Sequence, residues 1–279
     1  MKLYKTTEGS LFCIDTVFYR VPEKNGEQNW DALLANDDLY QFLTKSAATL
    51  KPLTGFSLKE STLLAPIQSQ EVWGAGVTYS RSKSARMEES PGGANFYDKI
   101  YDAQRPELFF KATPHRVIGT GHAVRIRKDS AWNVPEPELT FAISSQGKII
   151  GYTVGNDMGS RTIEAENPLY LPQAKIYDQS CALGPCILLT EKPLSGDAKI
   201  HLKITRNNDV SFEGSVPFSQ MKRDPKELVA YLFRDNSFPA GCFLMTGTGL
   251  VPPNEFTLQV GDQIQITIDG IGTLNNSVK

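Results

Sequence analysis

The sequence has few of the residues that bind soft metals and no sign of a disulfide framework. Its three histidines, at positions 115, 122 and 201, do not have the close spacing of a zinc site, so a His-based zinc centre is not expected. The four cysteines show no C-x-x-C spacing and lie in apolar stretches. This pattern favours buried free thiols in a cytoplasmic protein over disulfide bonds. The cysteines are Cys13, Cys181, Cys186 and Cys242.

The chain also lacks the features of a membrane or nucleic-acid protein. No run of about 18 apolar residues could span a bilayer, and the first residues, 1–6, lack the apolar core of a signal peptide. The 29 Lys and Arg residues nearly balance the 31 Asp and Glu residues, giving a formal net charge of −2. Without a basic excess, neither nucleic acid nor an anionic membrane is the expected partner. A small-molecule partner is favoured instead.

The 279 residues are enough for one sizeable core and a smaller satellite unit. We predict a small N-terminal α/β domain over residues 1–70 and a catalytic domain over residues 71–279. Apolar residues at near-helical spacing between Trp30 and Leu43 predict helix in the first part. Strand-like runs precede them at residues 2–6, 10–15 and 17–21. The fold class expected is α+β and rich in β-structure.

The second part reads as many short strands separated by Gly and Pro, interrupted by few helices. Two helices are expected at residues 81–88 and 95–103. A third begins at Asp224, where an N-cap Asp, Pro225 and a Glu three residues after the cap form a strong start signal. After Asp262 the residues alternate strictly, as in a half-buried strand.

Two acidic residues, Glu136 and Glu138, carry the most information about chemistry. They stand two positions apart in Val134-Pro-Glu-Pro-Glu-Leu139, where each Pro favours an extended backbone. Alternate residues of an extended segment point to the same side, so the two carboxylates lie side by side. Like charges held that close repel unless a positive charge lies between them. The alternative, from spacing alone, is a pair of solvated acids on an edge strand.

A third carboxylate joins the pair if the following segment forms a hairpin. Two apolar runs surround a turn containing Gly147, which is typical of a β-hairpin. With Gln146 and Gly147 as a two-residue loop, Glu136 lies opposite Asp157, and opposite residues share a face. A loop one residue longer would break this pairing. Three oxygen ligands without His or Cys suit Mg²⁺, with Mn²⁺ or Ca²⁺ as alternatives.

These residues, with several later motifs, resemble the fumarylacetoacetate hydrolase family. The motifs are the E-x-E pair, Asn156-Asp157 followed by Arg161, Lys175, the glycine turn 246–251 and the segments 260–262 and 268–276. The resemblance covers residues 71–279. It implies a mixed β-roll, a homodimer or dimer of dimers, and a divalent ion that chelates a 2-oxo acid or 1,3-dicarbonyl substrate.

Within the family, the segments 72–79, 105–111 and 132–138 are similar to those of sugar-acid dehydratases. Hydrolytic members carry a His–Glu pair that activates water, and Ser82 and Ala85 stand in those places here. The resemblance therefore implies Mg²⁺-dependent dehydration of a 2-keto-3-deoxy sugar acid to an oxo-aldehyde such as 2,5-dioxopentanoate. The acid pair is expected to support elimination of water.

The resemblance and the chemistry together suggest roles for two further residues. Dehydration needs a base that removes a proton from C3 and an acid that protonates the departing C4 hydroxyl. Lys175 is the candidate base, and Glu107, just before an apolar strand, is the candidate acid. The assignment could be the reverse. Taken alone, Lys175 would be a surface lysine and Glu107 a solvated strand-end acid.

Other residues are expected near the substrate with less support from the sequence. Thr248, in a glycine-flanked turn, could offer backbone N–H groups and a hydroxyl to the substrate carboxylate. Tyr79, Arg81 and Ser82 could contact the hydroxyls of the sugar acid. Arg161 is a candidate for orienting a metal-binding carboxylate.

Two other functions remain open at this point. One is a C–C hydrolase or decarboxylase of acylpyruvates or related 2-oxo acids, using water placed differently. The other is a non-catalytic, metal-dependent binding module for dicarboxylates. Only a measured turnover and its product distinguish these functions.

Overall fold

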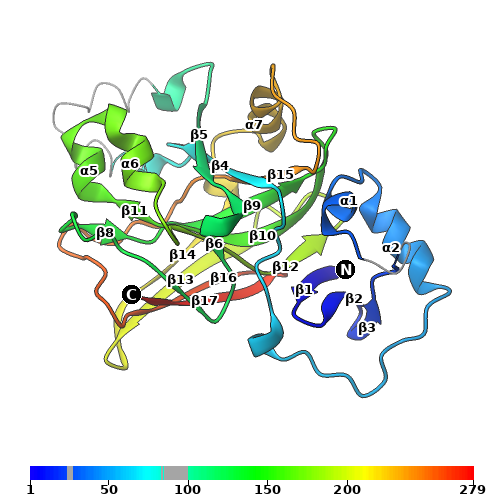
Figure 1. The fold of residues 1–279 in the computed structure, drawn as a ribbon. Helices are drawn as coiled ribbons and strands as arrows, with labels where there is room; N and C mark the ends of the chain where they lie inside the picture. Colours follow the sequence, from blue (N-terminus) through cyan, green and yellow to red (C-terminus); the bar gives the residue numbers. More distant parts are fainter. Residues whose placement is uncertain (24–27, 83, 85–99) are drawn as a thin grey trace.

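The protein is described by a computed structural model that covers residues 1–23, 28–82, 84 and 100–279. Two β-sheets pack against each other and carry most of the structure, with short helices at their edges (Figure 1). Buried residues from both sheets, such as Phe141 and Ile266, belong to one hydrophobic cluster. This agrees with the β-rich α+β fold expected from the sequence.

The larger sheet has ten strands within the described residues. Its order is β3-β2-β1-β12-β10-β9-β15-β4-β5, and β6 pairs with β12. Parallel pairing of β15 with β4 and of β6 with β12 makes the sheet mixed. The strands span β1 (Lys2–Thr6), β2 (Gly9–Ile14), β3 (Val17–Arg20), β4 (Glu71–Gly76), β5 (Glu107–Ala112), β6 (Val117–Ile118), β9 (Pro137–Ile143), β10 (Ile149–Asp157), β12 (Cys181–Leu189) and β15 (Cys242–Met245).

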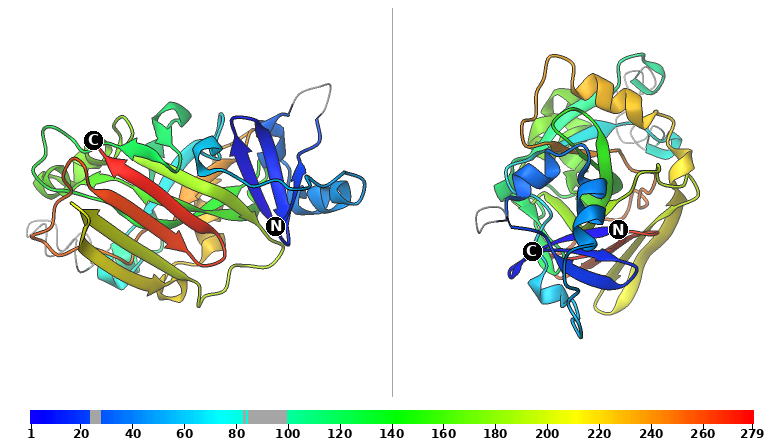
Figure 2. Two further views of the ribbon diagram at one scale, coloured as in Figure 1. Left: turned by 90° about the horizontal axis from the view of Figure 1, so that it is seen from below. Right: turned by 90° about the vertical axis from the view of Figure 1, so that its right-hand side faces the viewer.

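The second sheet has the order β14-β13-β16-β17-β7, and a two-stranded ribbon joins β8 and β11. Figure 2 shows β16 and β17, in orange and red, side by side near the C-terminus. The strands span β7 (His122–Val124), β8 (Asn133–Val134), β11 (Gly159–Ser160), β13 (Lys199–Arg206), β14 (Asp209–Pro217), β16 (Gln263–Ile268) and β17 (Gly272–Val278). Strand β16 confirms the alternating strand expected after Asp262.

The helices of the described residues are short and lie in three groups (Figure 1). They are α1 (Trp30–Leu34), α2 (Leu39–Ala47), α5 (Arg161–Glu166), α6 (Leu171–Lys175) and α7 (Pro225–Leu232), with 3-10 turns at Glu60–Thr62, Pro114–Arg116, Pro168–Tyr170 and Phe218–Gln220. No helix in the described ranges is long and apolar enough to cross a membrane.

The helices predicted from the sequence are confirmed to different extents. Helix α7 confirms its start signal, because the Asp224 side chain accepts a hydrogen bond from the N–H of Lys226. The single helix expected from Trp30 to Leu43 is two helices, α1 and α2, separated by a turn. Of the helix expected at 81–88, residues 83 and 85–88 lie outside the described residues, as do residues 95–99 of the next. Residues 80–82 and 84 and residues 100–102 are helical.

Strands β1, β2 and β3 extend the larger sheet into the N-terminal part of the chain, because β1 pairs with β12 (Figure 2). A hydrophobic cluster also joins the two parts, containing Phe12 and Trp30 from the first and Leu183 and Phe243 from the second. Strands β9, β12 and β15 are therefore covered on both faces, which explains their nearly continuous apolar sequences. The division at residue 70 stays a prediction.

The hairpin of β9 and β10 brings the predicted acids to one end of the larger sheet. Near the turn, Ile143 pairs with Ile149, so the loop is one residue longer than the sequence suggested. A bulge at Ile150 then adds one residue to β10 and restores the expected register. The N–H of Asp157 donates to the carbonyl of Glu136 at 3.0 Å, which confirms that the two residues face each other.

Strand β15 is expected to be a main support of this end of the sheet. Leu244 is fully buried between β9 and β4, so Leu244→Ala should lower the free energy of unfolding by about 2–5 kcal/mol. Urea unfolding measures this change. In the control, Val210→Ala, the side chain is 53% exposed and the change should stay within about 0.5 kcal/mol. Equal effects of the two substitutions would contradict the placement of β15.

Candidate active site

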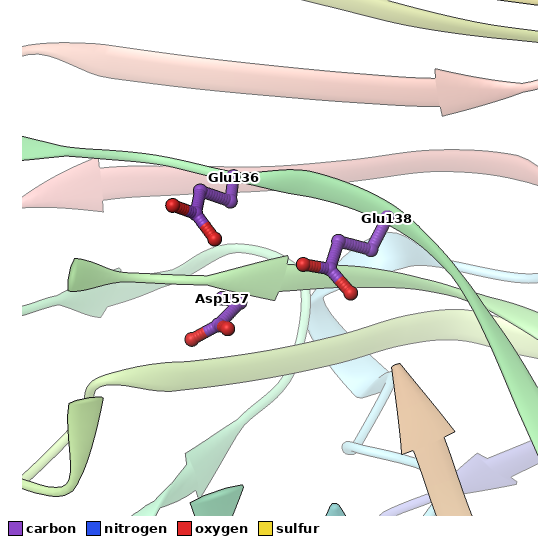
Figure 3. A group of neighbouring side chains, drawn as sticks. All are labelled: Glu136, Glu138 and Asp157. Atoms are coloured by element: carbon purple, nitrogen blue, oxygen red, sulfur yellow. The ribbon is translucent and has the colours of Figure 1, made fainter. Parts of the chain in front are cut away.

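Three carboxylates converge at the end of the β9–β10 hairpin, as Figure 3 shows. Glu136 precedes β9, Glu138 lies in β9, and Asp157 ends β10. One oxygen from each lies within 4.8 Å of the others. All three residues are buried, with exposed fractions of 5% or less. The sequence thus predicted both the members of this acid trio and their common face.

Burial and mutual repulsion make the acid trio unfavourable when it is fully ionised. Burial raises the pKa of Glu138 well above its ordinary range, and the nearby Asp157 and Glu136 carboxylates raise it further. The Lys175 ammonium and the N–H of Gly247 act in the opposite direction. A divalent cation between the three oxygens would favour their ionised forms. The all-oxygen donor set fits a hard ion such as Mg²⁺.

Lys175, at the end of α6, directs its amine into the acid trio. The Nζ atom lies 2.6 Å from Glu136 Oε2 and 3.2 Å from Asp157 Oδ2. Gly159 lies beside it, and a Cβ atom at this glycine would come within 3.0 Å of Nζ. Lys175 is 1% exposed, so it is not the surface lysine that its sequence context alone would suggest.

A second buried lysine, Lys111 in β5, contacts the same region from the opposite side. Its Nζ lies 2.5 Å from Asp157 Oδ1 and donates to the carbonyl oxygens of Met158 and Lys175 at 2.9 Å and 2.6 Å. The lysine is completely buried. Asp157 is therefore held between two ammonium groups, Lys111 on one oxygen and Lys175 on the other.

Helix α5 adds an ion pair behind the acid trio. Arg161 Nη2 lies 2.9 Å from Glu136 Oε1, which fits the expectation that Arg161 orients a carboxylate. Glu164, one turn along the helix, lies 3.5 Å from the Arg161 guanidinium and 3.6 Å from Lys175 Nζ. The Ser160 side chain caps the helix by accepting from the N–H of Ile163.

The glycine turn after β15 closes the site near Glu138. The N–H of Gly247 donates to Glu138 Oε2 at 2.7 Å. Gly247 has a φ of +87°, and a Cβ atom there would lie 2.2 Å from Thr78 Oγ1. The Thr248 hydroxyl donates to the carbonyl of Leu250 and accepts from its N–H, at 3.1 Å and 3.2 Å. This places Thr248 firmly at the wall of the site.

A cavity opens from the acid trio toward β4, β5 and the helices α5 and α6. Half-buried Glu107 lines it, and Gly76 leaves room for the Glu107 carboxylate, because a Cβ atom at Gly76 would lie 2.1 Å from Oε2. The other described lining residues are Ala75, Val77, Ser82, Ile100, Phe109, Glu136, Glu138, Asp157, Arg161, Pro168, Leu171, Lys175, Gly247 and Thr248.

The residues suggested for substrate contact differ in whether they line the cavity. Ser82 lines the cavity, but its hydroxyl donates to the carbonyl of Tyr79 at 2.8 Å and accepts from its N–H at 3.3 Å. Tyr79 itself lies in the core cluster, and burial, with a smaller effect of Glu138, raises its pKa. Arg81 is exposed, and neither it nor Tyr79 is among the described lining residues. Ala85 lies outside the described residues.

Sequence reasoning missed Lys111 and Glu164. A signal for Lys111 exists: it is a lone lysine in the apolar run Leu108-Phe-Phe-Lys-Ala112, and a buried ammonium needs partners. For Glu164, the only signal is its spacing of three from Arg161, which puts both on one side of a helix. Neither signal identifies the partner, because Asp157 and Lys175 are distant in sequence.

The raised pKa of Glu138 makes metal binding and stability depend on pH. The folded protein holds this proton more tightly than the unfolded chain, whose Glu pKa is about 4.3, so the contribution of Glu138 to stability without metal falls as pH rises above about 4.3. Mg²⁺ should displace the proton and stabilise the protein more at about pH 8 than at about pH 5.5. Thermal unfolding with Mg²⁺ or EDTA measures this, and calorimetry in two buffers counts released protons. A Mg²⁺ effect that is independent of pH would contradict the assignment.

Gly247→Ala should weaken Mg²⁺ binding about tenfold or more, because the Cβ atom would push the turn and its N–H away from Glu138. Isothermal titration of the purified variant measures the affinity. The matched control is Gly121→Ala, which has a φ of +77° but no atom within 4 Å of the added Cβ. An equal loss in both variants would point to backbone strain instead of the lost hydrogen bond.

Comparison with known proteins identifies the family of this chain. Residues 72–279 match the family model of the fumarylacetoacetate (FAA) hydrolase C-terminal domain. The probable 2-keto-3-deoxyxylonate dehydratase of Haloferax volcanii is 49% identical over 76% of this chain and 73% of its own length. The 2-dehydro-3-deoxy-D-arabinonate dehydratase of Saccharolobus solfataricus is 46% identical over 81% and 78%. A solved 2-keto-3-deoxy-D-arabinonate dehydratase, complexed with magnesium and 2,5-dioxopentanoate, has a TM-score of 0.84, 38% identity, and coverage of 100% and 99%. The chain belongs to the fumarylacetoacetate hydrolase family.

Proposed function

We propose that the protein is a Mg²⁺-dependent dehydratase of a 2-keto-3-deoxy sugar acid and forms an oxo-aldehyde such as 2,5-dioxopentanoate. The observation that carries this proposal is the buried Lys175 amine directed into the acid trio. The resemblance to dehydratases, one of them complexed with magnesium and 2,5-dioxopentanoate, supports the same reaction.

Glu136, Glu138 and Asp157 would hold the magnesium ion. Bound there, Mg²⁺ supplies Lewis-acid chemistry that withdraws electrons from a 2-oxo acid and makes its C3 proton easier to remove. Arg161 and Lys111 keep two of the carboxylates oriented by direct ion pairs. The N–H of Gly247 does the same for the third.

The charges around the site favour a singly charged anion as substrate. Four buried carboxylates, those of the acid trio and Glu164, meet three buried cations, Lys111, Arg161 and Lys175, so these seven groups carry a formal charge of −1. While Lys175 is protonated, a divalent cation changes the sum to +1, and the carboxylate of a 2-oxo acid brings it to zero. Since unbalanced charge is costly in a buried site, the pair of ion and monoanion is favoured.

Two residues at the cavity have the chemistry that elimination needs. Lys175, whose amine is directed into the acid trio, would take the proton from C3 after releasing its own proton to solvent, because only the neutral amine acts as a base. Glu107, in β5, also lines the cavity and in its protonated form would donate a proton to the departing C4 hydroxyl. Thr248 and Ser82 line the cavity and would border the substrate. Tyr79 and Arg81 are not among its described lining residues, so the cavity does not support substrate contacts from them.

The site offers little for activating water, which supports elimination over hydrolysis. The Ser82 hydroxyl, in the place where hydrolases carry a His, is already engaged with the backbone of Tyr79. No histidine is found among the described residues that line the cavity. A C–C hydrolase or decarboxylase would need a base other than an imidazole there.

We further propose that the protein acts as a homodimer or a dimer of dimers in the cytoplasm. The family resemblance supports the assembly. The four free cysteines, three of them buried, support a reducing compartment. We also propose the division into residues 1–70 and 71–279, with the catalytic groups all in the second part.

Assay of the purified protein with Mg²⁺ on a panel of 2-keto-3-deoxy pentonates, hexonates and acylpyruvates tests the function. We expect an aldehyde product, detected by a coupled aldehyde dehydrogenase, and loss of turnover in EDTA. Pyruvate or carbon dioxide as product would support the hydrolase or decarboxylase. Tight binding of dicarboxylates without turnover would support the binding module, and either result overturns the dehydratase.

Variants then test the assigned roles. Lys175→Met should lower kcat by about 10²–10⁴-fold because the proton acceptor is lost, while Mg²⁺ still binds. Lys148→Met is the matched control, since Lys148 lies at the exposed hairpin turn and its amine pairs with Asp38 on the surface. Glu107→Gln should also lower kcat, because the group that protonates the departing hydroxyl is lost. A Lys175→Met variant with normal kcat would contradict the assignment.

A further inference from the structure

Lys111 is a buried cation that the proposed reaction does not use directly. It lies in β5 with no exposed surface and is not among the described residues that line the cavity. Its ammonium contacts three oxygens, Asp157 Oδ1 at 2.5 Å and the carbonyls of Met158 and Lys175 at 2.9 Å and 2.6 Å. Burial of an ammonium is unfavourable unless such partners are present.

The three oxygens belong to two separate segments. Asp157 ends β10 and Met158 directly follows it, whereas Lys175 ends α6, a helix of five residues. A helix that short is not stable by itself, so its orientation depends on tertiary contacts. The carbonyl of Lys175 accepts from Lys111 and also from the Ser180 hydroxyl at 2.9 Å. The backbone of Lys175 is therefore anchored on the side opposite to its amine.

We propose that Lys111 is a positioning residue that fixes the end of β10 and the end of α6 relative to each other. Through it, the carboxylate of Asp157 and the amine of Lys175 form one rigid unit. This inference rests on the proposed function, in which Asp157 binds the metal and Lys175 removes the proton. Lys111 acts through these two residues and does not touch the substrate.

The geometry requires a lysine at this position. One tetrahedral nitrogen reaches the three oxygens from a single point, which a planar guanidinium on a longer side chain cannot reproduce. The space around the Lys175 amine is also restricted, because a Cβ atom at Gly159 would lie 3.0 Å from Lys175 Nζ. A shift of about 1 Å between base and substrate can lower a rate about 100-fold.

Lys111→Met tests the proposal with three measurements on the same protein. We expect kcat to fall about 100-fold or more with KM changed less than about threefold, since alignment is lost and binding is not. Mg²⁺ affinity by calorimetry should be equal or higher, because a positive charge next to the acid trio is removed. A crystal structure with Mg²⁺ should show the Lys175 amine displaced from Asp157 by about 1 Å or more.

Lys111→Arg is a second variant that keeps the positive charge but not the tetrahedral geometry. It should retain Mg²⁺ affinity, with a kcat between those of the wild type and Lys111→Met. The matched control is Lys5→Met, which removes another lysine that donates to a main-chain carbonyl, that of Ile67, far from the site. Its kcat and Mg²⁺ affinity should equal those of the wild type.

Normal kcat in either Lys111 variant would overturn the proposal. So would loss of Mg²⁺ binding in Lys111→Met with full recovery of kcat at saturating Mg²⁺, because Lys111 would then support only the metal. The position of the Lys175 amine does not depend on turnover. If the wild type dehydrates none of the acids, the proposed function fails, while an unmoved amine in Lys111→Met separately rejects the positioning role.

Discussion

Repulsion among three buried carboxylates is the constraint on which the site depends. Glu136, Glu138 and Asp157 lie too close together, and too far from water, to be ionised without positive charge nearby. The raised pKa of Glu138 is the direct consequence. The surrounding lysines, the arginine and the N–H of Gly247 all act against this repulsion, and a divalent cation completes the balance. The proposed function follows from the same need, because a divalent cation bound there would make a 2-oxo acid more reactive.

The fold meets this constraint by making the surroundings rigid. The acid trio stands at the end of a hairpin whose strands are covered on both faces, so its backbone cannot relax to separate the charges. Strand β15 passes beside β9 and continues into the turn that carries Gly247 and Thr248. Helices α5 and α6 are short, and ion pairs hold them against the site. A polar centre of this kind is stable only because apolar packing surrounds it on the remaining sides.

The same scaffold can support different reactions when the groups beside the metal change. A His–Glu pair next to the acid trio would favour attack by water. Here Ser82 uses its hydroxyl on the backbone of Tyr79, and the groups left near the acid trio are an amine and the Glu107 carboxyl. Proton removal and proton donation are the chemistry that these two groups offer. The reaction is therefore determined by a few side chains on a fold that many activities share.

The sequence by itself determined the features that depend on local geometry. Glu136 and Glu138 share a face because a strand repeats every two residues, and Asp224 begins a helix because its side chain caps the adjacent N–H groups. The sequence predicted the correct pairing at the end of the hairpin that carries the acids. It did not predict the longer loop or the bulge at Ile150 that compensates for it, because no local signal shows either. The family resemblance already assigned Lys175 to the site, but only the tertiary structure decided that Lys111 and Glu164 lie beside the acid trio. Their segments meet through strand pairing and helix packing, and contacts between residues so distant in sequence are set by the whole core.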